Sequence, residues 1–169
     1  MHLLKTGMDN KLIKAKDTAG VIAPPPLIFL SGLLLGGIVQ WFNRLYIFSA
    51  EYLFTARIFG ALLIVFGLGV ILIARSKMQK AQTNIEPWKP TNAIISDGIY
   101  SYSRNPIYVS LILIYLGVAS IFNAVWLLPP LALVLIAMQY GVILREERYL
   151  KTKFGDEYSG YMKNVRRWI

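Results

Sequence analysis

The sequence predicts an all-α membrane protein, a bundle of about four transmembrane helices with a C-terminal helical hairpin and a cytosolic helical tail. Of its 169 residues, 56% are hydrophobic and only 16% are charged, whereas a soluble domain is nearer half apolar and a quarter charged. The apolar residues are gathered into blocks with few charges, as membrane spans require. The length fits one integral membrane domain, residues 1–169.

Four apolar blocks supply the predicted spans, at about residues 26–42, 54–74, 107–121 and 124–144. The first block follows three prolines, which are tolerated in the first turn of a helix. Residues 107–144 carry no charge, but as one helix they would be ~57 Å long, so the chain must turn back once, near Phe122 and Asn123. Pro129 and Pro130 are expected to kink the last span.

Lysines and arginines predict the orientation, because short loops rich in them stay in the cytosol. They crowd the N-terminal tail (1–20), the loop 75–104 and the tail 145–169, whereas the loop between the first two spans holds Arg44, with Arg57 near its edge. The N- and C-termini are therefore predicted to be cytosolic. Placed in loops, the net charge of +9 points to anionic lipid headgroups and predicts no nucleic-acid partner.

The sequence lacks the residues that several kinds of catalytic or binding site require. The chain has no cysteine, which excludes disulfides, thiolate nucleophiles and cysteine metal sites. No cluster has metal-ligand spacing, and there is neither a phosphate loop nor a nucleophile triad, so no metal is predicted. The glycines of the first two spans, Gly32 and Gly36 and then Gly60, Gly67 and Gly69, instead predict close approach of helices.

The hairpin should bring two polar segments to the same interface. Because the chain reverses near Asn123, we expect residues 98–108 and 145–147 to lie close together. Pro106 can begin the third span, which places Asn105 at the N-cap, where its side chain can accept a hydrogen bond from a free N–H. Tyrosines and an arginine at this point also fit a simple interface belt, and Glu146 and Glu147 also fit solvated charges beside arginines. The functional interpretation of Glu146 and Glu147 is recognition of a cationic ligand or of ribose hydroxyls.

The C-terminal half, from near Thr83, resembles the isoprenylcysteine carboxyl methyltransferase family and its phospholipid methyltransferase relatives. The resemblance rests on two motifs in order, separated by the uncharged hairpin. The motifs are Gly98-x-Tyr100-x-x-x-Arg104-Asn105-Pro106-x-Tyr108 and Glu146-Glu147-x-x-Leu150-x-x-x-Phe154-Gly155-x-x-Tyr158-x-x-Tyr161. The aromatic side of the last segment suits either packing or membrane contact.

The resemblance implies S-adenosylmethionine as cofactor, with S-adenosylhomocysteine as product, held between the last two spans, the preceding loop and the tail. The cofactor-binding positions that it implies are Asn92, Ala93, Ile94, Ile95, Tyr100, Asn105, Pro106, Ile107, Tyr108 and Glu146. Glu147 and Arg145 are the candidate catalytic residues: Arg145 as a contact to the acceptor, and Glu147, or alternatively Glu146, as the base for an amine acceptor. Two departures matter. Asparagine replaces the usual histidine at Asn105, and Val142 stands where prenylcysteine enzymes have an arginine, which argues against a prenylated cysteine carboxylate as substrate.

These implications predict a methyltransferase acting on a membrane lipid or lipid-linked acceptor, either a carboxylate or an amine, at the cytosolic interface. Methyl transfer from an activated donor needs alignment and exclusion of water more than a set of acids and bases, which suits this sequence.

Two alternatives stay open. One is a non-catalytic membrane protein that binds lipid or partner helices. The other is an NADPH-dependent enzyme like the sterol reductases, whose Arg-His-Pro-Asn-Tyr motif compares with Arg-Asn-Pro-Ile-Tyr here. The acceptor and the oligomeric state are not predicted.

Overall fold

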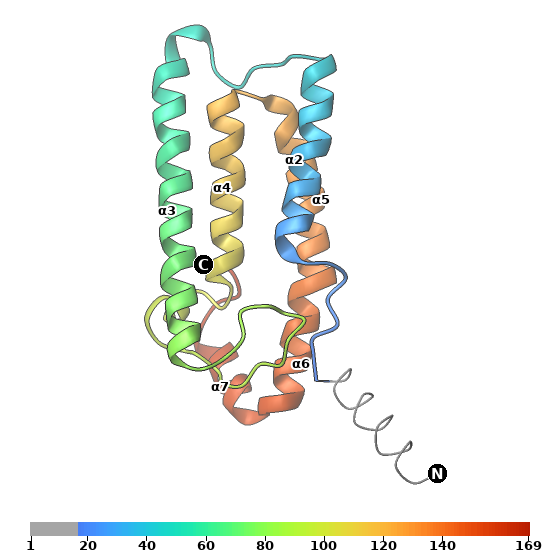
Figure 1. Ribbon diagram of the computed structural model, residues 1–169, viewed down its shortest axis with the longest axis vertical. Helices are drawn as coiled ribbons and strands as arrows, with labels where there is room; N and C mark the ends of the chain where they lie inside the picture. The colour runs from blue at the N-terminus through green and yellow to red at the C-terminus, as the bar shows by residue number, and fades with distance from the viewer. Residues whose placement is uncertain (1–16) are drawn as a thin grey trace, which may run out of the picture.

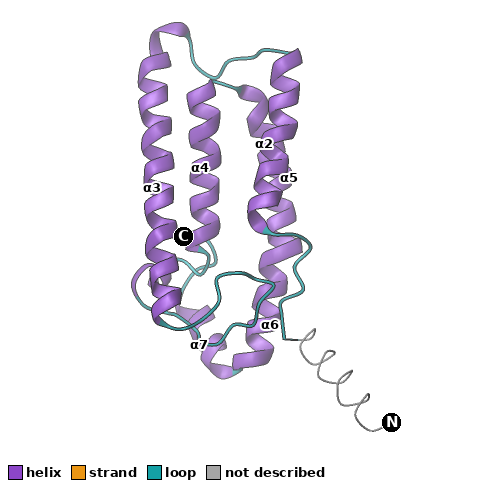
Figure 2. Cartoon of the chain, in the orientation of Figure 1, coloured by secondary structure: helices purple, strands orange, loops and turns teal. Residues whose placement is uncertain are grey.

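The computed structural model describes residues 17–169, which form helices and loops and no strand (Figure 2). Residues 1–16, which include the lysines of the N-terminal tail used for the orientation, lie outside the described residues. The helices are α2 (Pro25–Phe42), α3 (Leu53–Lys80), α4 (Pro106–Phe122), α5 (Leu128–Met138), α6 (Leu144–Phe154) and α7 (Asp156–Asn164). Short 3-10 turns cover Ala50–Tyr52, Gly98–Ser101 and Val125–Leu127. The all-helical prediction is confirmed.

The long helices stand side by side as a bundle, with α3 packed on α4 and α2 packed on α5 (Figure 1). The helices beginning at Pro25, Ala50 and Val125 are long and apolar enough to cross a membrane, and α4 is a shorter apolar helix. At 17 residues, α4 is about 25 Å long, short of a ~30 Å hydrocarbon core unless the bilayer thins locally. Large apolar side chains are exposed on the outward faces, among them Leu34, Phe54, Leu62, Phe66, Leu72, Leu133 and Ile136. Such faces fit a lipid environment, and the predicted membrane helix bundle is confirmed.

Two helices extend beyond the predicted spans. Helix α3 continues to Lys80, so residues 75–80 belong to the helix and not to the following loop. The last span passes through a π-helical turn, Gln139–Ile143, directly into α6, so there is no break at residue 145. Arginine, lysine, glutamate and glutamine favour helix, so a helix has no cause to end where its apolar residues end.

The hairpin turn forms where it was predicted. Asn123 ends α4 in the left-handed conformation, with φ of +51°. Its side-chain oxygen accepts from the Phe48 N–H at 2.8 Å and its amide donates to the Phe48 carbonyl at 2.9 Å, which ties the turn to the loop before α3. Pro129 and Pro130 occupy the first turn of α5, where their missing N–H groups would have no helical partner. They therefore lie where the helix begins, and the kink expected there stays a prediction.

Glycines allow the backbones of α3 and α4 to touch. A Cβ added at Gly60 would lie 2.6 Å from the Gly117 carbonyl oxygen, and a Cβ at Gly117 would lie 2.6 Å from that of Gly60. Gly36 of α2 faces the Trp126 carbonyl in the same way, at 2.5 Å. Close approach at Gly32, Gly36, Gly60 and Gly67 is as predicted, whereas a Cβ at Gly69 would meet nothing within 4 Å.

The Gly60→Ala variant is expected to be less stable than the wild type by about 1–3 kcal/mol, because α3 and α4 must separate to admit one methyl group. The measurement is thermal unfolding in detergent. Gly69→Ala, on the same helix but facing open space, is the matched control and should unfold at or slightly above the wild-type temperature. Equal melting temperatures for the two variants would show that the backbone contact does not limit the packing.

Candidate functional site

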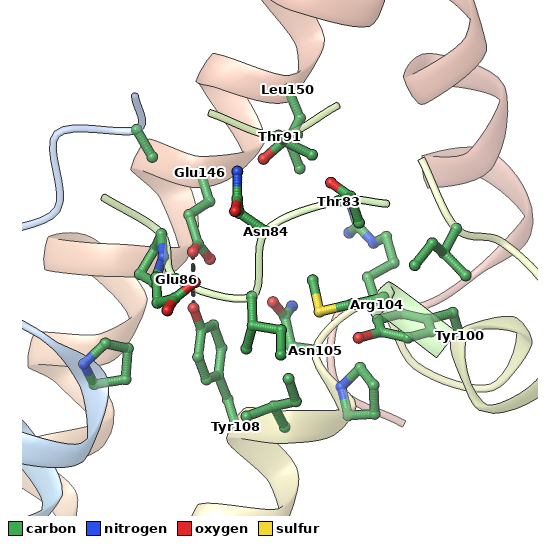
Figure 3. Close-up of a pocket in the computed structure, with 18 of the residues that line it drawn as sticks. Thr83, Asn84, Glu86, Thr91, Tyr100, Arg104, Asn105, Tyr108, Glu146 and Leu150 are labelled. Carbon is green, nitrogen blue, oxygen red and sulfur yellow. Dashed lines mark hydrogen bonds between the residues drawn. The ribbon is translucent and has the colours of Figure 1, made fainter. Parts of the chain in front are cut away.

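A cavity of about 350 Å³ lies at the end of the bundle where α4 begins. Its wall comes from the loop between α3 and α4, from parts of α3, α4, α6 and α7, and from the start of α2 with Ala19 before it (Figure 3). Most of the lining surface is apolar, with a few polar side chains directed inward. This combination is typical of sites that bind small molecules.

The structure brings most of the predicted site residues to this cavity. Its lining includes Ala93, Ile94, Ile95, Tyr100, Asn105, Pro106, Ile107, Tyr108, Glu146 and Glu147. Asn92 and Arg145 are exposed and lie outside the lining. Asn92 instead bridges Thr83 and Gln82 with hydrogen bonds of 2.9 Å, and Arg145 donates to the Gly20 carbonyl at 2.8 Å.

Glu146 faces the cavity beside Tyr108. The Tyr108 hydroxyl donates a hydrogen bond of 2.7 Å to Glu146 Oε1, a contact drawn in Figure 3. Pro106 starts α4, so Tyr108 lies in its first turn, and Glu146 lies in the first turn of α6. The predicted closeness of the two segments is confirmed. Within residues 17–169, Glu146 forms no salt bridge with a lysine or arginine.

Glu147, the next residue, is instead held by arginines. Arg167 Nε and Nη2 donate to its two carboxylate oxygens, each at 2.8 Å. Arg104 Nη1 lies 3.1 Å from Glu147 Oε1, and Glu147 is only 7% exposed. Consecutive residues of a helix point about 100° apart, so Glu146 points into the cavity beside Tyr108, while Glu147, in the cavity wall, forms an ion cluster with Arg104 and Arg167.

The C-terminal segment passes beside the start of α4 and holds the two residues that precede this helix. The Arg104 N–H donates to the Arg166 carbonyl at 3.0 Å, and the Asn105 side-chain amide donates to the Arg167 carbonyl at 2.9 Å. Asn105 occupies the N-cap position, but its side chain caps no helical N–H, which corrects the prediction from sequence. The Asn105 side chain is instead held by the hydrogen bond to the Arg167 carbonyl. Pro106 has no N–H, so one fewer N–H group at the start of α4 needs a cap.

The aromatic side of α7 packs against the site and does not face the membrane. Tyr158, Tyr161 and Val165 form a buried cluster with Ile94 and Leu150 around it. The Tyr161 hydroxyl donates to the Tyr100 carbonyl at 2.7 Å. Burial, with the charge of Glu147, raises the pKa of Tyr158 to about 12. Burial, with the nearby Tyr161 and Glu146, also raises the pKa of Tyr100 well above its usual value. Both hydroxyls therefore stay protonated and able to donate at neutral pH.

Sequence reasoning missed several residues of the site. Arg167 was only one of the tail's basic charges, and no pattern pairs it with a glutamate twenty positions earlier. Asn84, Glu86 and Tyr149 also line the cavity, and Tyr149 accepts a hydrogen bond of 3.1 Å from the Thr91 N–H, which ties the loop to α6. Tyr158 and Tyr161 had a signal, because both belong to the second motif.

Comparisons with known proteins agree with this arrangement. An uncharacterized protein of Haemophilus influenzae is 43% identical to this chain over 63 residues, which make up 37% of this chain and 98% of that protein. No solved structure matches the chain. The family model of the phospholipid methyltransferases matches residues 55–157, a region that holds nearly all of α3, the whole of α4 to α6, and both motifs up to Gly155. With more than half of its length matched, this chain belongs to the phospholipid methyltransferase family of integral membrane methyltransferases.

Proposed function

We propose that the protein uses S-adenosylmethionine to methylate an amine carried by a membrane lipid or lipid-linked molecule, at the cytosolic interface. The observation that carries the proposal is Glu146, a carboxylate without a salt bridge among residues 17–169, directed into a cavity lined by both motifs. A carboxylate acceptor would need no base and would be repelled by such a side chain, whereas an amine needs a group that accepts its proton.

The residues present fit the cofactor. The cavity of about 350 Å³ falls in the usual range of small-molecule sites, roughly 300–1,000 Å³. The Tyr100 hydroxyl lies in the lining, is buried, and has no hydrogen-bond partner among the described residues, as expected of a donor that serves a ligand. The residues that would hold the cofactor are Ala93 to Ile95, Tyr100, Asn105 to Tyr108 and Glu146.

The chain's own residues would position and deprotonate the acceptor. When bound, S-adenosylmethionine would supply an electrophilic methyl group. The apolar lining would exclude water, which strengthens polar contacts and aligns the reactants. The acceptor nitrogen would form a bond to the methyl carbon as the carbon–sulfur bond breaks, and the electron pair of the broken bond would remain on sulfur. Glu146 would accept the proton that the nitrogen loses. The Tyr108 hydroxyl would keep the carboxylate oriented.

Glu146 suits this role better than Glu147. Two guanidinium groups contact the Glu147 carboxylate, so its oxygens already accept charged hydrogen bonds and are less available to an acceptor amine. Glu146 receives one hydrogen bond from a neutral hydroxyl. We therefore propose Glu147 as a residue that holds the tail, and Glu146 as the proton acceptor.

The lining also supports entry of the acceptor from the bilayer. Pro25 and Pro26 of α2, Ile71 of α3 and Leu111 of α4 contribute to the cavity wall. Pro25 and Pro26 begin the apolar helix α2, and Ile71 and Leu111 belong to the apolar parts of α3 and α4, so the cavity wall is continuous with the apolar segments of the bundle. An acceptor with acyl chains can keep them in the membrane while its headgroup enters the polar end.

The test is titration of the detergent-purified protein with S-adenosylhomocysteine, followed by transfer of a labelled methyl group into a lipid extract. NADPH is the control ligand, and a Tyr100→Ala, Glu146→Ala double variant is the control protein. Saturable binding that the variant loses, with label in an amine-bearing lipid, is expected. Binding of NADPH instead would favour reductase chemistry, and a folded protein that binds neither ligand would favour the non-catalytic alternative.

The proposed orientation predicts the labelling of single cysteines, which is clean because the chain has none of its own. Ala50 lies at the end of the bundle opposite the cavity and Lys163 lies in α7 on the cavity side, and both are exposed. In intact cells, a membrane-impermeant maleimide should label Ala50→Cys but not Lys163→Cys, because the basic loops stay in the cytosol. The reverse pattern would place the cavity outside the cytosol.

A further inference from the structure

The ion cluster of Arg104, Glu147 and Arg167 contains more positive than negative charge. Two guanidinium groups share one carboxylate, and arginine cannot lose its proton in a protein. Within residues 17–169, Arg104 has no salt bridge other than that with Glu147. One positive charge is therefore left uncompensated inside the cluster.

Arg104 carries the excess positive charge of the ion cluster into the cavity wall. Its side chain is 8% exposed and belongs to the cavity lining. Its Nε and Nη1 atoms are buried and make no aligned hydrogen bond with the described residues, whereas Arg167 is held in a bidentate pair and is 32% exposed. A buried charge without full hydrogen bonding is costly, so the site gains from an anion placed beside Arg104.

A second unpartnered donor lines the same cavity. The Tyr100 hydroxyl is buried and has no hydrogen-bond partner in the described part of the chain. Figure 3 shows Arg104 and Tyr100 on one side of the cavity, and Glu146 with Tyr108 on the other. One side of the cavity thus has two arginines on a single carboxylate, Glu147, together with the unpartnered Tyr100 hydroxyl, and the other side has Glu146, an arrangement that suits a ligand carrying both signs of charge.

We propose that Arg104, with the Tyr100 hydroxyl, forms an oxyanion-binding subsite for a carboxylate or phosphate group of a ligand in this cavity. If the proposed function holds, the group is either the carboxylate of the cofactor's methionyl part or the phosphate of the lipid headgroup. The subsite itself rests on the charge excess and the unpartnered donors. Guanidinium suits both groups, because its planar fork of N–H donors matches their paired oxygens.

The experiment compares charged ligands with their uncharged counterparts in wild type and in Arg104→Gln. The first pair is S-adenosylhomocysteine and its carboxamide, and the second is dihexanoyl phosphatidic acid and dihexanoylglycerol. Wild type should bind one charged ligand about tenfold or more tightly than its counterpart, and Arg104→Gln should lose that preference. A preference in the first pair identifies the cofactor's carboxylate, and a preference in the second identifies the lipid phosphate.

Two further variants keep the result interpretable. Arg148→Gln removes the same charge from an exposed position of α6 and should retain the wild-type preference. Tyr100→Phe removes one oxygen, and should weaken the same preference even if Arg104→Gln does not fold. Wild type with no preference in either pair, or variants at both positions with the full preference, would overturn the proposal. Failure of S-adenosylhomocysteine to bind would count against the proposed cofactor alone, since the phospholipid pair still tests the subsite.

Discussion

Replacing Glu146 with glutamine is expected to lower the rate of methyl transfer by about 10²–10⁴-fold, the usual contribution of a positioned proton acceptor. Glutamine keeps the shape of the side chain and can still accept the hydrogen bond from Tyr108, but it cannot take a proton. The measurement is the initial rate of label transfer at saturating cofactor, with the affinity for S-adenosylhomocysteine measured in parallel. The rate of the variant should rise with pH, because at high pH the acceptor amine loses its proton to water.

Two comparisons separate this role from others. Glu157→Gln, an exposed glutamate of α7, removes the same charge and should leave the rate unchanged. Tyr108→Phe should cost less than Glu146→Gln, because it removes the orienting hydroxyl and keeps the base. An unchanged rate at saturation, with weaker binding of S-adenosylhomocysteine, would contradict proton transfer and leave Glu146 as a cofactor contact only.

Replacing Glu147 with alanine is expected to lower the free energy of unfolding by about 3–5 kcal/mol, the range for removing one partner of a buried ion pair. The variant would leave Arg104 and Arg167 close together with no carboxylate between them. Arg167 is 32% exposed and can turn toward solvent, whereas the Arg104 side chain is only 8% exposed and would stay largely buried. The measurement is chemical or thermal unfolding in detergent, with Glu157→Ala as the matched control.

A double-mutant cycle with Arg167→Ala tests the cause. The Glu147→Ala, Arg167→Ala double variant should be more stable than the sum of the two single losses predicts, because it removes one of the stranded charges. Arg166→Ala, whose side chain is exposed and whose carbonyl is kept, should behave as the wild type. Additive losses would mean that the bidentate pair contributes little and that the tail is held by its carbonyl contacts.

The sequence predicted the parts of the fold that depend on local pattern. Uncharged blocks marked the helices, and an uncharged stretch too long for one span required the turn that Asn123 makes. The same turn brought Tyr108 and Glu146 together, because the start of α4 and the end of the last span must lie at the same interface. These conclusions needed only helix geometry and membrane thickness.

The parts that were missed depend on contacts between distant residues. The side-chain oxygen of Asn105 could have accepted a helical N–H of α4, but the side chain is oriented by its amide N–H, which donates to the Arg167 carbonyl 62 positions away. No local pattern indicates where the tail passes. The continuation of the last span into α6 was missed because the charge pattern marks where the apolar residues end and not where the helix ends. The different surroundings of Glu146 and Glu147 depend on the rotation of α6, which the sequence alone does not specify.

The π-helical turn Gln139–Ile143 makes this rotation tolerant of the loss of a single codon. Such a turn holds one residue more than an α-helix would at that place. Loss of one codon from it would convert the turn to α-helix and leave α6 in its present rotation relative to α5. Glu146 would still point into the cavity, and Glu147 would still pair with Arg104 and Arg167. In the gene, a one-codon deletion within this turn should therefore be less damaging than a substitution of either glutamate.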